Sequence, residues 1–187
     1  MRRWLLFSAL IVASLTVPAV SHAQIMNGDF EIGGADWTPG VPVGWSVAFP
    51  DSGGNPDGFA QITMFGDSEG RGCVNQGFKC GEQGGRTRCE MAIDYRLDHL
   101  KGDNNTTGRV VVRIDGIDVF TSPLVAPDGW QHITFDIPCG FHTIGLCLEA
   151  DAGDNAWSAG FDNVTSDCMT PVPVAPKTWS SLKTLYR

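Results

Sequence analysis

The feature that most constrains the fold of this chain is a repeated alternation of apolar and polar residues in short runs. The clearest run, residues 89–97, places on one face the side chains of Cys89, Met91, Ile93, Tyr95 and Leu97. This period of two is typical of a half-buried strand. Similar runs recur between clusters of Gly, Pro, Asn and Asp, and no useful helical periodicity follows residue 23. The sequence therefore predicts an all-β fold, a two-sheet antiparallel β-sandwich (jelly roll) stabilised by disulfides.

Turn signals separate the predicted strands. Asp115-Gly116 lies between the runs 109–114 and 117–121 and predicts a hairpin with a type I′ turn. Further strands are predicted at residues 58–65, 133–137, 144–148 and 157–165. Residues 51–58 and 66–85 are rich in Gly, and we expect two long loops there. The second loop contains Cys73 and Cys80, which suggests that disulfides pin it.

The composition permits a packed core and argues against some ligand classes. Apolar residues make up 42% of the chain and charged residues 18%, whereas a disordered chain would be less apolar and more charged. The formal net charge is -8. This acidic balance argues against binding to nucleic-acid phosphates or to an anionic membrane surface, because both partners favour a basic face.

The first 23 residues have the layout of a secretory signal peptide. Arg2 and Arg3 precede an apolar run over residues 4–17, and Ser21 and Ala23 place small residues at a cleavage site. The apolar run is too short to span a bilayer comfortably. We therefore expect a protein that is secreted or held at the cell surface, with a β-sandwich domain over residues 24–168.

All six cysteines follow the expected cleavage site, and an even count in an exported chain favours disulfides. The candidates are Cys73, Cys80, Cys89, Cys139, Cys147 and Cys168. A zinc site is disfavoured because no pair has the C-x-x-C spacing and the histidines are scattered. The sequence does not select a connectivity. One antiparallel pairing of residues 89–97 with residues 157–168 places Cys89 opposite Cys168 and Arg96 opposite Phe161, and it permits a Cys89–Cys168 disulfide.

Both ends of the predicted domain carry short motifs. Residues 26–31 read M-N-G-D-F-E and precede Gly44-Trp45, and residues 160–164 read G-F-D-N-V. In this order and spacing the motifs resemble those of galactose-binding-domain-like jelly rolls, especially the non-catalytic carbohydrate-binding modules. Residues 110–116 resemble the hairpin of the same family, and Gly129-Trp130-Gln131 also fits its pattern. The cysteines and the segment 66–85 depart from that pattern, so the ligand-binding loops are expected to differ.

The resemblance implies a structural calcium ion between the chain ends of the domain. Carboxylate and carbonyl oxygens brought together by the first and last strands suit such a hard cation. Glu31 of the F-E motif and Asp162 of the D-N-V motif are the ligands that the resemblance implies, and Asp29 is a further candidate. The alternative is that Glu31 and Asp162 are solvated turn and edge residues. Residues 51–57 form either a second oxygen-rich loop or plain turns.

Carbohydrate is the ligand that the resemblance implies, and aromatic rings with polar neighbours are the groups that bind it. Trp37 and Trp157 stand in loop contexts, so we expect them to be exposed for stacking. Trp130 is out of phase with the strand that follows it and is expected on an outer face or at a bend. For each tryptophan the alternative is a cap over one end of the sandwich. Asp94 and Arg96 either line a binding face or form an ion pair on a solvated face.

Catalytic signatures are weak. Residues 65–68 resemble the G-D-S block of lipase-like esterases, with Ser68 as nucleophile, but no D-x-x-H motif supplies its partners. No motif selects a carboxylate pair for glycosidase chemistry. We therefore expect a binding module that is not an enzyme and whose partner is a polysaccharide or glycan. The alternatives are a surface structural or adhesion domain that binds a protein, and a small secreted hydrolase.

A C-terminal segment follows the domain. Pro171, Pro173 and Pro176 predict an extended linker over residues 169–177. Residues 178–187 read TWSSLKTLYR and resemble a T-W-x-x-hydrophobic-K-x-x-Y-R ending of exported bacterial proteins. A short motif on a linker suggests a tag for sorting or surface-attachment machinery. A disordered or back-packed tail is the alternative.

Overall fold

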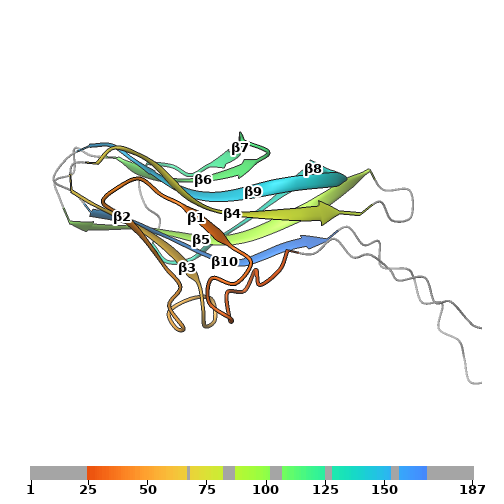
Figure 1. The fold of residues 1–187 in the computed structure, drawn as a ribbon, viewed down its shortest axis with the longest axis horizontal. Coiled ribbons are helices and arrows are strands. Elements are labelled where there is room, and N and C mark those ends of the chain that lie inside the picture. The colour runs from red at the N-terminus through yellow and green to blue at the C-terminus, as the bar shows by residue number, and fades with distance from the viewer. Residues whose placement is uncertain are drawn as a thin grey trace, which may run out of the picture.

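The computed structural model describes residues 25–66, 68–81, 87–101, 107–124, 128–152 and 156–167. Within these ranges the chain forms ten strands (Figure 1). They are β1 (Thr38–Gly40), β2 (Trp45–Ala48), β3 (Ala60–Phe65), β4 (Gly70–Cys80), β5 (Arg88–Lys101), β6 (Gly108–Ile114), β7 (Ile117–Thr121), β8 (Gln131–Pro138), β9 (Gly140–Ala150) and β10 (Ala156–Asp167). The same ranges contain no helix, and therefore none that is long and apolar enough to cross a membrane.

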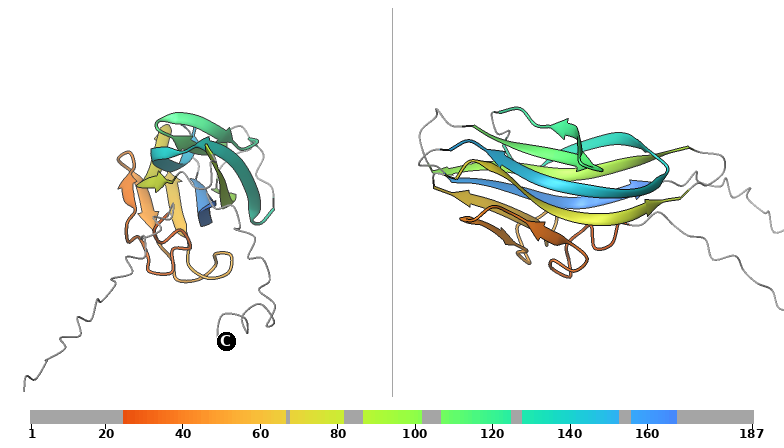
Figure 2. Two further views of the ribbon diagram at one scale, coloured as in Figure 1. Left: turned by 90° about the vertical axis from the view of Figure 1, so that its right-hand side faces the viewer. Right: turned by 45° about the horizontal axis from the view of Figure 1, so that its top comes forward.

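The strands build two five-stranded sheets in which every pairing is antiparallel. One sheet has the order β1-β4-β9-β6-β7 and the other β2-β3-β10-β5-β8. We call them the upper and lower sheet, after their places in Figure 1. Figure 2 shows the two layers packed face to face. The predicted two-sheet antiparallel sandwich is confirmed.

The core lies between the sheets and takes alternate residues from the long strands. From β5 and β9 it takes Met91, Ile93, Tyr95, Leu97, Ile144, Leu146 and Leu148, all of them buried. The inward face predicted for residues 89–97 is therefore correct. The predicted hairpin is correct as well, because Asp115 and Gly116 have φ values of 52° and 81°, as a type I′ turn requires.

The expectation of one long loop over residues 66–85 is wrong. Most of this segment is β4, which pairs with β1 on one side and with β9 on the other. Val74, Gln76 and Phe78 are buried at alternate positions. Glycines hide this alternation in the sequence, but one of them is required by packing: a Cβ at Gly72 would lie 2.7 Å from the ring of Trp45.

β5 and β10 pair in the predicted antiparallel direction. Over part of their length the observed register differs from the predicted one by one residue. Arg96 lies opposite Gly160, and the expected pairing with Phe161 is wrong. A register shift after Asp162 restores the expected register for the rest of β10. Asn163 lies in this irregular segment with a positive φ of 49°. A bulge of this kind inserts an extra residue into one strand, and the alternating pattern alone does not reveal it.

Candidate functional site

Two carboxylates nominated from the sequence meet on the outer face of the lower sheet, where the loop before β3 crosses it. Asp94 of β5 and Asp162 of β10 lie opposite each other and are buried. Asp162 accepts hydrogen bonds from the backbone N–H groups of Asn55 and Asn163. Asp94 accepts bonds from the side-chain amides of the same two residues, at 3.0 and 2.8 Å, and lies 2.6 Å from His132 Nδ1. The two carboxylates therefore fasten the loop to the sheet.

Burial raises the pKa of the Asp162 carboxyl. The nearby carboxylates of Asp94 and Glu31 act in the same direction, and the backbone hydrogen bonds to Asp162 only partly oppose them. The ionised form of Asp162 is therefore disfavoured in the folded chain. A cation beside this carboxylate would offset that cost.

Glu31 holds the far end of the same loop. Its Oε1 accepts a hydrogen bond of 3.0 Å from the Gly58 N–H. The start of the domain lies beside β10, because the Val164 N–H donates to the Gly28 carbonyl at 2.9 Å. Glu31 and Asp162 thus reach one loop from opposite ends of the domain.

The donor set at this loop fits a calcium ion in its chemistry. Glu31 and Asp162 offer carboxylate oxygens and the loop offers carbonyl oxygens, which are the ligands that calcium prefers. Asp29 has a different role in the structure: its Oδ1 lies 3.4 Å from the Glu31 N–H and closes a local turn.

Arg96 lies between two aromatic rings on the same face of the lower sheet. Its Cζ is 5.4 Å from the ring centroid of Phe59 and 5.2 Å from that of Trp130. Its Nε donates to Asp98 at 2.8 Å. The structure thus brings Trp130 and Arg96 together on an outer face, with Asp94 on the same strand as Arg96. Since Arg96 stacks on Trp130 and Asp94 is saturated with hydrogen bonds, these groups mainly hold the loop in place.

Trp37 and Trp157 are buried, and the expectation that they are exposed is wrong. Only 5% of Trp37 and 4% of Trp157 is accessible. Trp37 packs 5.0 Å from the ring of Phe30, and Trp157 stacks at 4.4 Å on His99. These partners come from other segments of the chain and cover the rings. The alternative reading, in which the tryptophans cap the sandwich, describes them better than ligand stacking does.

Two disulfides join cysteines of the described residues. Cys73 and Cys147 are linked across β4 and β9, and Cys80 is linked to Cys89. The Cys89–Cys168 disulfide that one strand register permits is not formed, because Cys89 is bonded to Cys80. Cys168 itself lies outside the described residues.

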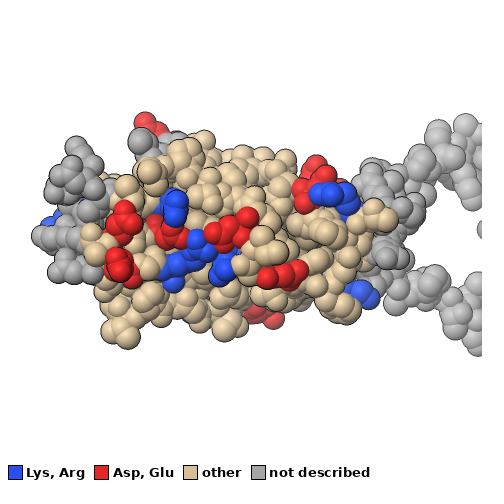
Figure 3. Space-filling view, turned by 90° about the horizontal axis from the view of Figure 1, so that it is seen from above, with Lys and Arg blue, Asp and Glu red and all other residues tan. Residues whose placement is uncertain are grey.

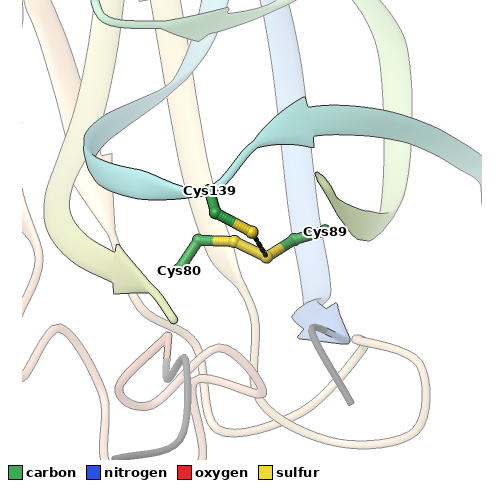
Figure 4. Close-up of side chains that lie close together, drawn as sticks. All are labelled: Cys80, Cys89 and Cys139. Carbon is green, nitrogen blue, oxygen red and sulfur yellow. Dashed lines mark hydrogen bonds between the residues drawn. A yellow bond between two sulfur atoms is a disulfide. The ribbon is translucent and has the colours of Figure 1, made fainter. Parts of the chain in front are cut away.

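The sulfur of Cys139 lies 3.8 Å from that of Cys89, so three sulfur atoms gather at one end of the sandwich (Figure 4). Among the described residues this is the one group of three or more Cys, His, Asp or Glu side chains close enough together to share a metal ion. The disulfide between Cys80 and Cys89 removes two of the thiolates that a metal would need.

The outer face of the upper sheet curves inward along its strands. In Figure 1, β4 and β9 dip between their ends, and the tilted view in Figure 2 shows the same curvature. We call the outward-facing surface of β4, β9, β6 and β7 the concave face. Phe141 stands near one end of it, 79% exposed, with Lys79 Nζ 5.1 Å from its ring centroid. Beside them the sheet is uncovered at Gly77, because a Cβ there would meet nothing within 4 Å.

A network of ion pairs occupies the other half of the concave face. Arg71 donates to Asp118 at 2.8 and 3.0 Å and to Glu149 at 2.7 Å. Arg109 donates to Glu149 at 2.7 Å, and Arg113 Nε lies 3.0 Å from Asp118. Figure 3 shows this face from above, with basic and acidic groups interleaved over one half of it. The network therefore spans all four strands of the concave face.

Buried apolar groups of the upper sheet face the same side as the network. Cys73, Cys147 and Val111 form a small buried cluster of their own, apart from the main core. Val111 lies between Arg109 and Arg113 on β6, and alternation places these three side chains on one face. The disulfide thus helps to form the floor on which the arginines rest.

The network keeps its carboxylates ionised. The hydrogen bond from Arg71 is the main cause that lowers the pKa of Asp118. Burial acts to raise the pKa of Glu149, but the bonds from Arg109 and Arg71 outweigh it and the net shift is downward. Burial also acts to lower the pKa of Arg71, yet its bonds to both carboxylates raise it overall. The shifts of Asp118, Glu149 and Arg71 therefore all favour the charged form of the group.

Sequence analysis missed the concave face, although part of its signal was present. Residues 144–148 were assigned an inward face from Ile144, Leu146 and Leu148, and the same period places Phe141 and Glu149 outward. The partners on β4 could not be found, because that segment was expected to be a loop. The possible nucleophile Ser68 lies elsewhere, with its Oγ 3.5 Å from the Val43 carbonyl.

No family model matches the chain. No curated protein matches it by sequence either.

Solved structures do share its fold. One is titled TmCBM61 in complex with beta-1,4-galactotriose; it is 13% identical, with a TM-score of 0.50, over 79% of this chain and 99% of that chain. An exo-beta-agarase is 13% identical, with a TM-score of 0.50, over 81% of this chain and 26% of that chain. The tailspike protein 4 of bacteriophage CBA120 is 12% identical, with a TM-score of 0.50, over 77% of this chain and 21% of that chain. At these identities the likeness concerns the fold, and this chain has a jelly-roll β-sandwich like that of carbohydrate-binding modules.

Proposed function

We propose that this protein is an exported, non-catalytic module that binds carbohydrate on its concave face. The observation that supports this function is the pairing of an exposed aromatic ring with a fixed network of polar groups on one inward-curving sheet. The fold shared with a module solved with a galactotriose points in the same direction.

The two halves of the concave face suit the two kinds of surface that a sugar presents. A pyranose ring has apolar C–H faces, which can lie against the exposed ring of Phe141. The hydroxyl groups of another sugar along the same polymer both donate and accept hydrogen bonds. Glu149, eight residues along β9 from Phe141, and Arg109 offer it donors and acceptors held in place by their ion pair. Between them Gly77 keeps the sheet open, so a ligand can lie close to the backbone.

A calcium ion would serve the structure and take no part in ligand chemistry. Glu31 and Asp162 are its proposed side-chain ligands. Burial, and to a smaller extent the neighbouring carboxylates, raise the pKa of Asp162, and a cation would offset both effects. Bound there, the ion would tie the first segment of the domain and β10 to the loop that crosses the lower sheet.

Export is supported by the layout of residues 1–23 and by the disulfides of the described residues, which suit an oxidising compartment. We propose further that residues 178–187 are read by sorting or surface-attachment machinery. Both segments lie outside the described residues. A variant lacking residues 178–187 that still reaches the same compartment as the full chain would contradict the tag.

A glycan array tests the proposed function, with the mature protein (residues 24–187) screened as wild type and as two variants. Phe141→Ala removes the exposed ring and is expected to weaken glycan binding by roughly fivefold, since an aromatic contact is worth about 1 kcal/mol. Phe65→Ala is the matched control, because Phe65 is also exposed (57%) but lies at the end of β3 in the lower sheet. Silence of folded wild-type protein on the array, or equal losses in both variants, would contradict the proposal.

A further inference from the structure

Basic side chains are concentrated on the concave face. Of the lysines and arginines in the described ranges, the concave face carries Arg71, Lys79, Arg109 and Arg113, and all the others lie on β5. Within the network three guanidinium groups face only two carboxylates, those of Asp118 and Glu149. The network therefore has an excess of positive charge, although the whole chain carries a net charge of -8.

The arginines retain donors that the network does not use. Arg109 donates hydrogen bonds from its Nε and Nη2 to one oxygen of Glu149, and its side chain is 41% exposed. Arg113 donates from Nη2 to the Gly116 carbonyl, and its Nε lies beside Asp118. In the described structure the Nη1 of each of these two arginines makes no hydrogen bond. Each therefore has an N–H group available to a ligand.

Two acidic residues at the rim of the face are already engaged. Asp151, two residues after Glu149, accepts a hydrogen bond from the Thr107 hydroxyl. Asp115, in the turn between β6 and β7, lies 2.7 Å from His142 Nδ1 and accepts a bond of 2.8 Å from the Thr143 N–H. These contacts, the bond from His142 first, lower the pKa of Asp115 and hold its charge at the edge of the sheet. It does not neutralise the arginine end of the face.

We infer that the ligand of the concave face is an acidic polysaccharide, whose carboxylate or sulfate group binds beside Arg109. This inference rests on the proposed function and adds the charge of the ligand to it. Guanidinium is the side chain whose planar donors best match carboxylate and sulfate oxygens. Because Glu149 holds Arg109 in position, little further ordering of its side chain is needed on binding.

The acidity of the rest of the protein does not prevent such binding. At physiological ionic strength charges are screened over about 8 Å, so the groups in contact with the ligand outweigh distant ones. Binding through this excess charge must weaken as salt is added, whereas binding of a neutral sugar by stacking and hydroxyl contacts must not.

Isothermal titration with polygalacturonate and with its fully methyl-esterified form tests the inference, since the two polymers share a backbone and differ in charge. Dextran sulfate and dextran form the corresponding pair for sulfate, and a neutral galactan reports on carbohydrate binding alone. At least one acidic polymer is expected to bind the mature protein at least tenfold more tightly than its neutral counterpart. That difference is expected to shrink in 0.5 M salt, where the Debye length is about 4 Å instead of about 10 Å at 0.1 M.

Two charge-removing variants locate the effect. Arg109→Gln keeps a donor for Glu149 and is expected to abolish the preference for the acidic polymer. Arg88→Gln is the control, because Arg88 is an exposed arginine on β5 of the lower sheet, 60% accessible. Equal affinity for the charged and neutral members of both pairs, or equal losses in both variants, overturns the inference and leaves the proposed function intact if a neutral glycan binds. If no glycan binds the folded protein, both are overturned.

Discussion

Two buried carboxylates of the lower sheet, Asp94 and Asp162, have no lysine or arginine partner in the described structure. Asp162 is held by backbone N–H groups and Asp94 by amides and His132, while Arg96 is committed to Asp98 and two rings. Because the pKa of Asp162 is raised in the fold, its protonated form is the stabilising one. That contribution is present below the ordinary carboxyl pKa and is lost as the pH rises through the folded value. At neutral pH the ionised group therefore costs stability until a cation joins it.

Calcium should accordingly raise the melting temperature of the mature protein at pH 7. At a hundred times Kd the gain is about 2.7 kcal/mol, which corresponds to several degrees for a domain of this size. The gain should vanish in Asp162→Asn and shrink in the wild type at acid pH, where Asp162 is protonated. Thermal melts with calcium and with a chelator measure it. Asp136→Asn is the control, because Asp136 is an exposed carboxylate of β8. A wild type that melts at one temperature in both conditions would exclude the site.

The place of a single residue was predictable from the sequence where a motif fixes its surroundings. Its burial was not predictable where tertiary contacts decide it. Glu31 and Asp162 were nominated from motifs, and the structure brings both to one loop. Trp37 and Trp157 lie among loop-forming residues, yet Phe30 and His99 cover them. His99 is remote from Trp157 in the chain, and Phe30 reaches Trp37 because the turns between them bring the two rings together. The pattern of the sequence reveals neither contact.

The elements show why strand prediction failed at β4 and succeeded at β5. In β5 every inward position is large and apolar, so the period of two is plain. In β4 the inward positions include Gly72 and Gln76, and glycine occurs on both faces. Gln76 is buried because its amide bonds to Met26 and Asp36 of the N-terminal segment. Packing against β1 and β9 makes this segment a strand, and that packing is tertiary.

The disulfide that joins β4 to β9 should contribute measurably to stability. Cys73 and Cys147 are 74 residues apart, and closing a loop of that length restricts the unfolded chain by several kcal/mol. Replacing both with Ser should lower the free energy of unfolding by about 2–5 kcal/mol in urea titrations. The matched variant Cys73→Val with Cys147→Val keeps apolar side chains in the same buried cluster. It should still lose most of that stability. Full recovery in the Val pair would assign the effect to buried hydroxyl groups instead of the missing bond.

At the scale of the whole molecule the two sheets have different tasks. The lower sheet is crossed by the loop before β3 and lies beside the start of the domain, so its outer face is largely committed to holding the chain together. The upper sheet leaves its concave face to solvent (Figure 3). The overall sandwich was predictable because alternation and turn signals are distributed along the chain. Which of the two outer faces stays open to solvent was not predictable, because it depends on which face the loops cover.

The end of the sandwich that gathers the sulfur atoms carries a prediction about the whole covalent structure. The chain has six cysteines, and the described disulfides use Cys73, Cys147, Cys80 and Cys89. Cys139 lies at this end, and Cys168 directly follows Asp167, which pairs with Glu90 next to Cys89. We therefore expect a third bond between Cys139 and Cys168, which would secure the end of β10.

Peptide mapping of the unreduced mature protein by mass spectrometry measures this connectivity, after alkylation at acid pH to prevent exchange. The expected products link Cys73 with Cys147, Cys80 with Cys89, and Cys139 with Cys168. A Cys139→Ser variant should then expose one alkylatable thiol, at Cys168, and keep the other two links. A peptide linking Cys89 to Cys168 would contradict this pattern, because it would require Cys80 to leave the partner that it has in the structure. The three-bond pattern would also tie β4, β5 and β8 to the exit of the C-terminal segment, so that reduction should loosen this end of the sandwich first.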